Sequence, residues 1–141
     1  CLALNRMTEA SRMAKEIYEK FPNEELAVHA YLEVLYSLGK YSDSLALIEK
    51  LLPSASSHLK SFLYYRRSFL ANGEQAVLSD LRSSLIANSR KEDSLFRLYK
   101  IYFEKKDYRR AQYYLKQVVA LHPANEEFLR LNRELEVLIQ Q

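Results

Sequence analysis

The stretch that decides the fold runs from residue 92 to residue 125 and reads EDSLFRLYKIYFEKKDYRRAQYYLKQVVALHPAN. Apolar side chains recur in it at every third or fourth position, first up to Phe103 and then again from Tyr108. A polar segment at 104–107 separates the two runs, and Pro123 stops the second one. This period is that of an amphipathic helix, so the stretch predicts two short helices joined by a tight polar turn.

This helix pair resembles a tetratricopeptide (TPR) repeat, a helix-turn-helix unit of roughly 34 residues. Large core residues on the first helix, an aromatic that opens the second, a small residue at the helix crossing and a final proline carry the resemblance. The matching residues are Leu98, Tyr102, Tyr108, Ala111, Leu115, Val118 and Pro123. The stretch departs from the family pattern at Leu95, where Trp or another large residue is usual, and at Tyr99, where a small one is usual.

The same period continues upstream. Residues 58–91 form a degenerate repeat, with Ser68 at an aromatic position, Val77 at the small position, and a turn at Asn72-Gly73. The pattern recovers over 25–57, where Gly39-Lys40-Tyr41 is followed by the small Ser44. Pro53 is expected to end the second helix of that repeat early.

The two ends complete the array. Residues 1–24 match only the second half of a repeat, with Ala10, Ala14 and Ile17 as its apolar stripe, so we expect the natural chain to extend upstream. Residues 126–141 predict an amphipathic capping helix, begun by Asn125. The resemblance therefore implies a single all-α domain over 1–141, a right-handed α-α superhelix of about eight antiparallel helices.

Composition supports this fold class. The chain has 141 residues, of which 48% are hydrophobic, but only two Gly and three Pro, too few for the many tight turns of a sandwich or barrel. No apolar run reaches the ~18–20 residues of a membrane span. Cys1 is the single cysteine, so no internal disulfide is possible. The compartment stays open: the cytoplasm is favoured, and a lipid anchor on Cys1 is the less favoured interpretation.

The charge is unevenly distributed. The net charge is +3, far from the strongly basic balance of many nucleic-acid-binding domains. Residues 58–91 carry six Lys or Arg against two Asp or Glu, so the middle of the chain is the basic part. Two mixed clusters, Tyr64-Tyr65-Arg66-Arg67 and 105–110, have the composition that grips phosphates and stacks bases, which keeps an RNA-binding helical repeat as a minor alternative.

In TPR arrays the first helix of each pair lines the concave surface, which implies a candidate groove. Its residues would be His29, Glu33, Tyr36 and Ser37, then Phe62, Arg66, Phe69 and Leu70, then Phe96, Arg97, Lys100 and Phe103. Aromatic residues and arginine dominate binding hot spots, so an acidic peptide or helix with apolar anchors would suit this surface. The alternative is that some of these rings pack between repeats and never reach solvent.

The function predicted from the sequence is a non-enzymatic scaffold that binds a partner protein. No catalytic constellation, metal-ligand spacing or phosphate loop is present, and no cofactor is implied. Some TPR arrays grip the acidic tails of chaperones with a Lys, Asn and Arg clamp, but Glu33 and Phe62 stand at matching places here, which argues against that partner. A structural segment of a longer solenoid, or self-association through the N-terminal half repeat, remains the alternative.

Overall fold

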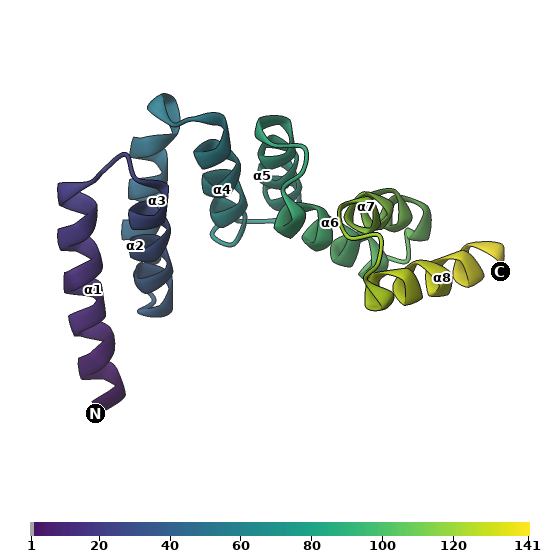
Figure 1. The fold of residues 1–141 in the computed structure, drawn as a ribbon, viewed down its shortest axis with the longest axis horizontal. Helices are drawn as coiled ribbons and strands as arrows, with labels where there is room; N and C mark the ends of the chain where they lie inside the picture. Colours follow the sequence, from purple (N-terminus) through teal and green to yellow (C-terminus); the bar gives the residue numbers. More distant parts are fainter. Residues whose placement is uncertain (1) are drawn as a thin grey trace. The chain divides into compact units, whose positions relative to one another are not determined.

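The computed structural model describes residues 2–141, and Cys1, with the lipid-anchor interpretation attached to it, lies outside them. The all-α prediction is confirmed, because the described residues form eight α-helices and one short 3₁₀ helix, with no strand among them (Figure 1). The elements are α1 Leu2–Lys20, α2 Glu25–Ser37, α3 Tyr41–Leu51, η1 Leu52–Ser54, α4 Ser57–Ser68, α5 Glu74–Ala87, α6 Glu92–Glu104, α7 Tyr108–Leu121 and α8 Glu126–Gln140.

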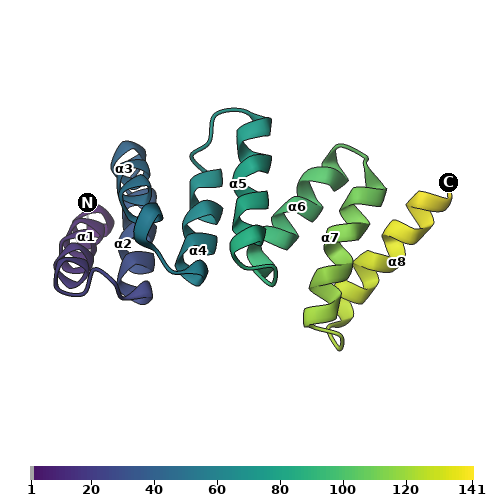
Figure 2. The same cartoon turned by 90° about the horizontal axis from the view of Figure 1, so that it is seen from above.

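The chain divides into two compact units, one ending at Leu59 and the other running from Lys60 to Gln141. Helix α4 starts in the first unit and continues in the second. Within each unit, successive helices run side by side in alternating directions, as Figure 2 shows for α6 and α7. The repeat boundaries proposed above stay a prediction.

The first unit packs α1 and α3 against α2 around Val28, Leu32 and Ile48. The prediction that Ile17 belongs to the buried stripe of α1 is wrong, because its side chain is 49% exposed whereas that of Tyr18 is 9% exposed. The ring of Tyr18 stacks on that of Tyr31 in α2, with 5.5 Å between centroids. The larger aromatic contact therefore sets which face of α1 turns inward.

The second unit has the larger core, built mainly from α6, α7 and α8. As predicted, Ala111 is fully buried, since the close approach of neighbouring helices leaves room only for a small side chain there. Around it lie Leu78, Leu81, Leu95, Leu98, Tyr99, Tyr102, Leu115, Val118 and Leu135. Phe128 and Leu131 of α8 pack on this cluster, so the predicted capping helix does cover it.

The helix ends follow local chemistry. Asn125 caps α8 as expected, since its side chain accepts a hydrogen bond from the Phe128 amide at 3.1 Å. Asp107 caps α7 in the same way, through the Arg110 amide at 3.2 Å. Helix α3 ends at Leu51, and Pro53 lies in the short 3₁₀ turn that follows, as predicted.

The turns after α2 and α6 have the same backbone conformation. Gly39 adopts φ 75° after α2, and the next amide, that of Lys40, donates to the Leu35 carbonyl at 2.9 Å. After α6 the same left-handed position is held by Lys106, with φ 61°. A side chain in this region costs ~1–2 kcal/mol relative to glycine. The two turns therefore close in the same way, but the second one is strained.

Candidate partner-binding groove

The predicted groove residues fall into two separate groups. Those on α2 belong to the first unit, and those on α4, on the turn after it and on α6 belong to the second. Within the second unit, the structure brings together the members on α6 and those at and just after the end of α4. The site is therefore built from the second unit.

A hollow of about 260 Å³ lies between the end of α4 and the face of α6 that carries Phe96 and Lys100. It is lined by Tyr65, Phe69, Asp93, Phe96, Arg97 and Lys100. Four of these were predicted, and the sequence reasoning missed Tyr65 and Asp93. Helical spacing could have found them, because Tyr65 precedes Phe69 by four positions and Asp93 precedes Arg97 by four.

A second hollow of about 430 Å³ continues between α6 and α8. It is lined by Phe96, Tyr99, Lys100, Phe103, Glu104, Glu127 and Leu131. Phe96 and Lys100 line both hollows, and the Lys100 ammonium sits 5.0 Å from the centre of the Phe96 ring. We call the two hollows together the α6 groove, and the shared Phe96–Lys100 pair its ridge.

Arginine and aromatic side chains interlock in the first hollow. The Arg97 guanidinium carbon lies 3.8 Å from the centre of the Phe69 ring, and the same group donates a hydrogen bond to the Ser68 hydroxyl. Phe69 also meets Tyr65 edge-on at 5.1 Å. Phe69 is 36% exposed, and a cation over an exposed aromatic face contributes ~0.5–1 kcal/mol. This contact holds the guanidinium of Arg97 in place at the edge of the hollow.

Phe62 does not belong to an exposed surface, and its assignment to the groove is corrected here. Its side chain is 3% exposed, with the Lys91 ammonium 5.6 Å from the centre of its ring. Phe62 therefore follows the alternative interpretation, in which a ring packs inside the fold, because α4 turns it inward beside the buried Leu63. Arg66 stays near the hollow instead, 5.6 Å from the Phe69 ring.

The members predicted on α2 form no comparable site. His29 and Ser37 are exposed, while Glu33 and Tyr36 are half-buried. Tyr36 packs its ring on that of Tyr41 at 5.2 Å. The two hollows described in the first unit are lined by other residues. Leu70, the remaining prediction, is half-buried in the turn after α4.

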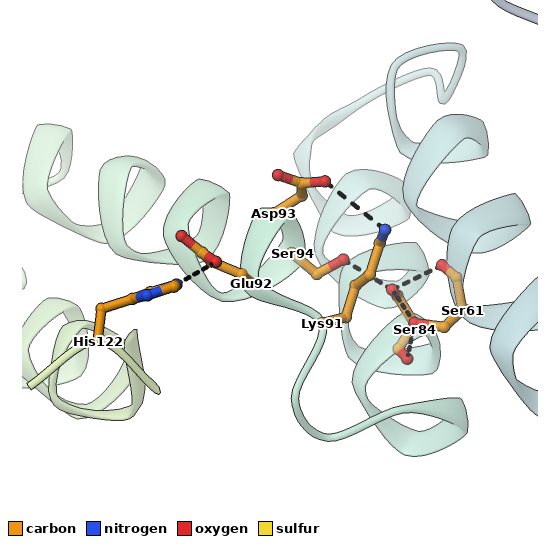
Figure 3. Close-up of polar contacts among 7 residues, drawn as sticks. All are labelled: Ser61, Ser84, Lys91, Glu92, Asp93, Ser94 and His122. Atoms are coloured by element: carbon orange, nitrogen blue, oxygen red, sulfur yellow. Dashed lines mark hydrogen bonds and ion pairs between the residues drawn. The ribbon is translucent and has the colours of Figure 1, made fainter. Parts of the chain in front are cut away.

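A buried polar network joins α4, α5 and α6 (Figure 3). Ser61 of α4, Ser84 of α5 and Ser94 of α6 are all fully buried. The hydroxyl of Ser84 donates to the Ser61 carbonyl at 2.7 Å and lies 2.7 Å from the Ser94 hydroxyl, while Ser61 donates to the Ser84 carbonyl at 2.8 Å. Because each hydroxyl is satisfied, the network fixes the register of the three helices.

An ion pair and a hydrogen bond lie beside this network at the start of α6 (Figure 3). The Lys91 ammonium is 3.6 Å from the carboxylate of Asp93, and His122 at the end of α7 is 2.6 Å from Glu92. In the second hollow, burial is the main cause that raises the pKa of Tyr99. Glu134 raises it further, Arg130 lowers it, and Glu127 makes a smaller raising contribution. The surroundings of Tyr99 are therefore mainly apolar.

The cluster at 64–67, whose composition suggested RNA binding, makes some of its contacts within the fold. Both Nε and an Nη of Arg67 donate to one carboxylate oxygen of Asp80, at 3.0 and 2.8 Å. The same guanidinium lies 5.2 Å from the Tyr64 ring. These contacts tie α4 to α5, so this arginine has a structural role.

In the described residues, no three His, Cys, Asp or Glu side chains gather so as to hold a metal ion. Within residues 2–141, no helix combines the length and the apolar character that a membrane crossing requires.

Comparisons with known proteins give a likeness of fold. No protein-family model matches the sequence, and no curated protein sequence does. Among solved structures, a MamA protein matches with a TM-score of 0.62 at 15% identity, covering 98% of this chain and 81% of its own. A second MamA structure matches with a TM-score of 0.64 at 14% identity, covering 98% and 87%.

A third solved structure extends this likeness. A thermophilic TPR protein from Thermus thermophilus matches with a TM-score of 0.62 at 19% identity, covering 98% of this chain and 77% of its own. At these identities the likeness concerns the fold and not the activity. Together with the helix pairs, the buried Ala111 and the capping helix, it establishes that this chain has a TPR-like helical-repeat fold.

Proposed function

We propose that this protein is a non-catalytic interaction scaffold whose α6 groove holds a segment of a partner protein. One observation carries the proposal: two adjoining hollows share the Phe96–Lys100 ridge and are lined by aromatic rings with cations between them. Rings and guanidinium groups supply most of the energy of protein–protein hot spots. A helical-repeat surface with this lining suits an extended or helical peptide.

The geometry favours a bound segment over a small molecule. The hollows are open and adjoin along one helix, whereas small-molecule sites usually enclose most of the ligand surface. A peptide could place one side chain in each hollow and cross the ridge between them. The aliphatic stem of Lys100 would then pack under the peptide while its ammonium stays at the rim.

The proposal can be tested by selecting a phage-displayed library of random linear peptides on the immobilised protein. Peptides that enrich are synthesised with a fluorescent label, and their Kd is measured by anisotropy against wild type and Lys100→Glu. Because Lys100 lines both hollows, we expect the variant to bind about tenfold or more weakly, equivalent to ~1.4 kcal/mol.

Lys116→Glu is the matched control, since it makes the same charge change on the exposed face of α7. It should bind as wild type does, and circular dichroism should show equal helicity for all three proteins. If Lys100→Glu and Lys116→Glu bind every enriched peptide equally well, or if no peptide enriches, the α6 groove is not a binding site.

A second candidate is a structural or self-associating segment, and an apolar stripe on α1 and the residue that follows it favours this candidate. Met13, Ile17 and Phe21 recur every four residues, and each is exposed. An apolar stripe of this kind suits packing against another helix. If no peptide enriches in the selection, this second candidate becomes the favoured function.

A further inference from the structure

The two hollows of the α6 groove carry opposite charge. The lining of the first includes Arg97 and Lys100 against the single acid Asp93, which leaves a net charge of +1. Two more cations border it. The Arg66 guanidinium lies 5.6 Å from the Phe69 ring, and the Lys91 ammonium lies 5.7 Å from the Tyr65 ring. The α4 side of the groove is therefore cationic.

The lining of the second hollow has the opposite net charge. Glu104 and Glu127 line it against the shared Lys100, which leaves a net charge of −1. The nearest arginine does not reverse this sign, because Arg130 is shared between Glu127 and Glu134 in two ion pairs. The α8 side of the groove is therefore anionic.

Both hollows nevertheless have apolar side chains in their lining. Phe69 lines the cationic hollow, Phe103 and Leu131 line the anionic one, and the ridge residue Phe96 borders both. An apolar side chain can thus be buried in each, with the charges arranged around the rims. Rim charges contribute less to affinity than buried rings, but they select partners and fix orientation.

We propose that the α6 groove recognises a polarised segment, with two apolar anchors, acidic residues at one end and basic residues at the other. The acidic end lies over α4 and the start of α6, and the basic end lies over the end of α6 and the start of α8. This inference rests on the proposed function, since it concerns the partner of that same groove.

The polarity would exclude uniformly charged partners. A wholly acidic segment would bring carboxylates beside Glu104 and Glu127, and a wholly basic one would bring cations beside Arg97 and Lys100. Like charges brought together at an interface cost free energy, so each mismatch lowers affinity and sets the direction of binding.

The test runs the same peptide library on wild type and on a Glu104→Lys/Glu127→Lys variant. On wild type we expect enriched peptides to carry acids on one side of their apolar anchors and bases on the other. On the variant, acids should replace the bases while the acidic end is unchanged. A peptide selected on wild type should bind the variant about tenfold more weakly at low salt.

The control is Glu136→Lys, which makes the same charge change on α8 as Glu127→Lys does. Glu136 lies nine positions after Glu127, which is about two and a half helical turns, so the two side chains point to opposite sides of the helix. Its peptides should match those of wild type, and circular dichroism should give equal helicity for all three proteins.

The outcomes separate the two proposals. Enriched peptides without charge asymmetry, or with an asymmetry that the double variant does not change, would overturn the polarity while leaving the groove as a binding site. If the enriched peptides bind wild type and Lys100→Glu with the same Kd, or if no peptide enriches, the groove assignment is wrong and the proposed polarity is wrong with it.

Discussion

Two helix junctions in the second unit meet the same steric demand with different chemistry. Where α6 packs on α7, the small residue is Ala111, fully buried among Leu98, Leu115 and Val118. Where α4, α5 and α6 meet, the small residues are Ser61, Ser84 and Ser94, equally buried but joined by hydrogen bonds (Figure 3). We call these the apolar junction and the polar junction.

The difference teaches what each junction can specify. Apolar contacts are non-directional, so the apolar junction gains stability from the area it removes from water and tolerates volume-conserving changes. Hydroxyl groups are directional and costly to bury without partners, so the polar junction holds only when all three helices are in register. That register positions α6, which carries the Phe96–Lys100 ridge shared by both hollows.

The largest effect is expected in the apolar junction. Leu115→Ala removes a fully buried side chain from the centre of the cluster and leaves a cavity, so the free energy of unfolding should fall by ~2–5 kcal/mol. Urea denaturation followed by circular dichroism measures it. Ile86→Ala is the control, since that side chain is 87% exposed and should cost no more than ~0.5 kcal/mol.

The polar junction should respond less, and through hydrogen bonding. Ser84→Ala leaves the Ser94 hydroxyl and the Ser61 carbonyl without the partner that joins them, which should cost ~1–2 kcal/mol after the gain in helix propensity. Ser83→Ala gains the same propensity at the neighbouring position and should change the urea midpoint little. Equal stabilities for the two variants would contradict the role of the network.

The smallest effect is expected at alkaline pH, on the outer edge of the apolar junction. Tyr114 stacks on Tyr102 with 5.8 Å between centroids, and burial is the main cause that raises its pKa above the usual 10.0. The folded protein therefore holds the Tyr114 proton more tightly than the unfolded chain does. The contribution of this group to the free energy of unfolding is complete below pH ~10 and is lost as pH rises through the folded pKa.

Adjacent tyrosines provide a matched pair for this measurement. Tyr114→Phe should lose less of its own stability than wild type does between about pH 9 and about pH 11, by urea denaturation at each pH. Tyr113→Phe alters a side chain that is 64% exposed and should follow the wild-type curve. Identical curves for the two variants would show that burial of Tyr114 has no such effect.

The fold was predictable because its signals are local. The 3.6-residue period of apolar positions marked the helices, and the polar segment 104–107, Pro53 and Asn125 marked their ends. The groove was predictable only in part. Phe69, Phe96, Arg97 and Lys100 were assigned from their register and do line the first hollow, whereas Phe62 has a similar register and is buried.

Helical register says which side chains share a face, but not how deeply that face is covered. That depth depends on neighbouring helices, which is why the inward side of α1 was assigned to Ile17 rather than Tyr18. The sequence by itself determined the helices, the small residues at their crossings and the capping helix. Only the tertiary structure decided which aromatic rings reach solvent and that opposite charges border two adjoining hollows, because both follow from contacts between helices distant in sequence.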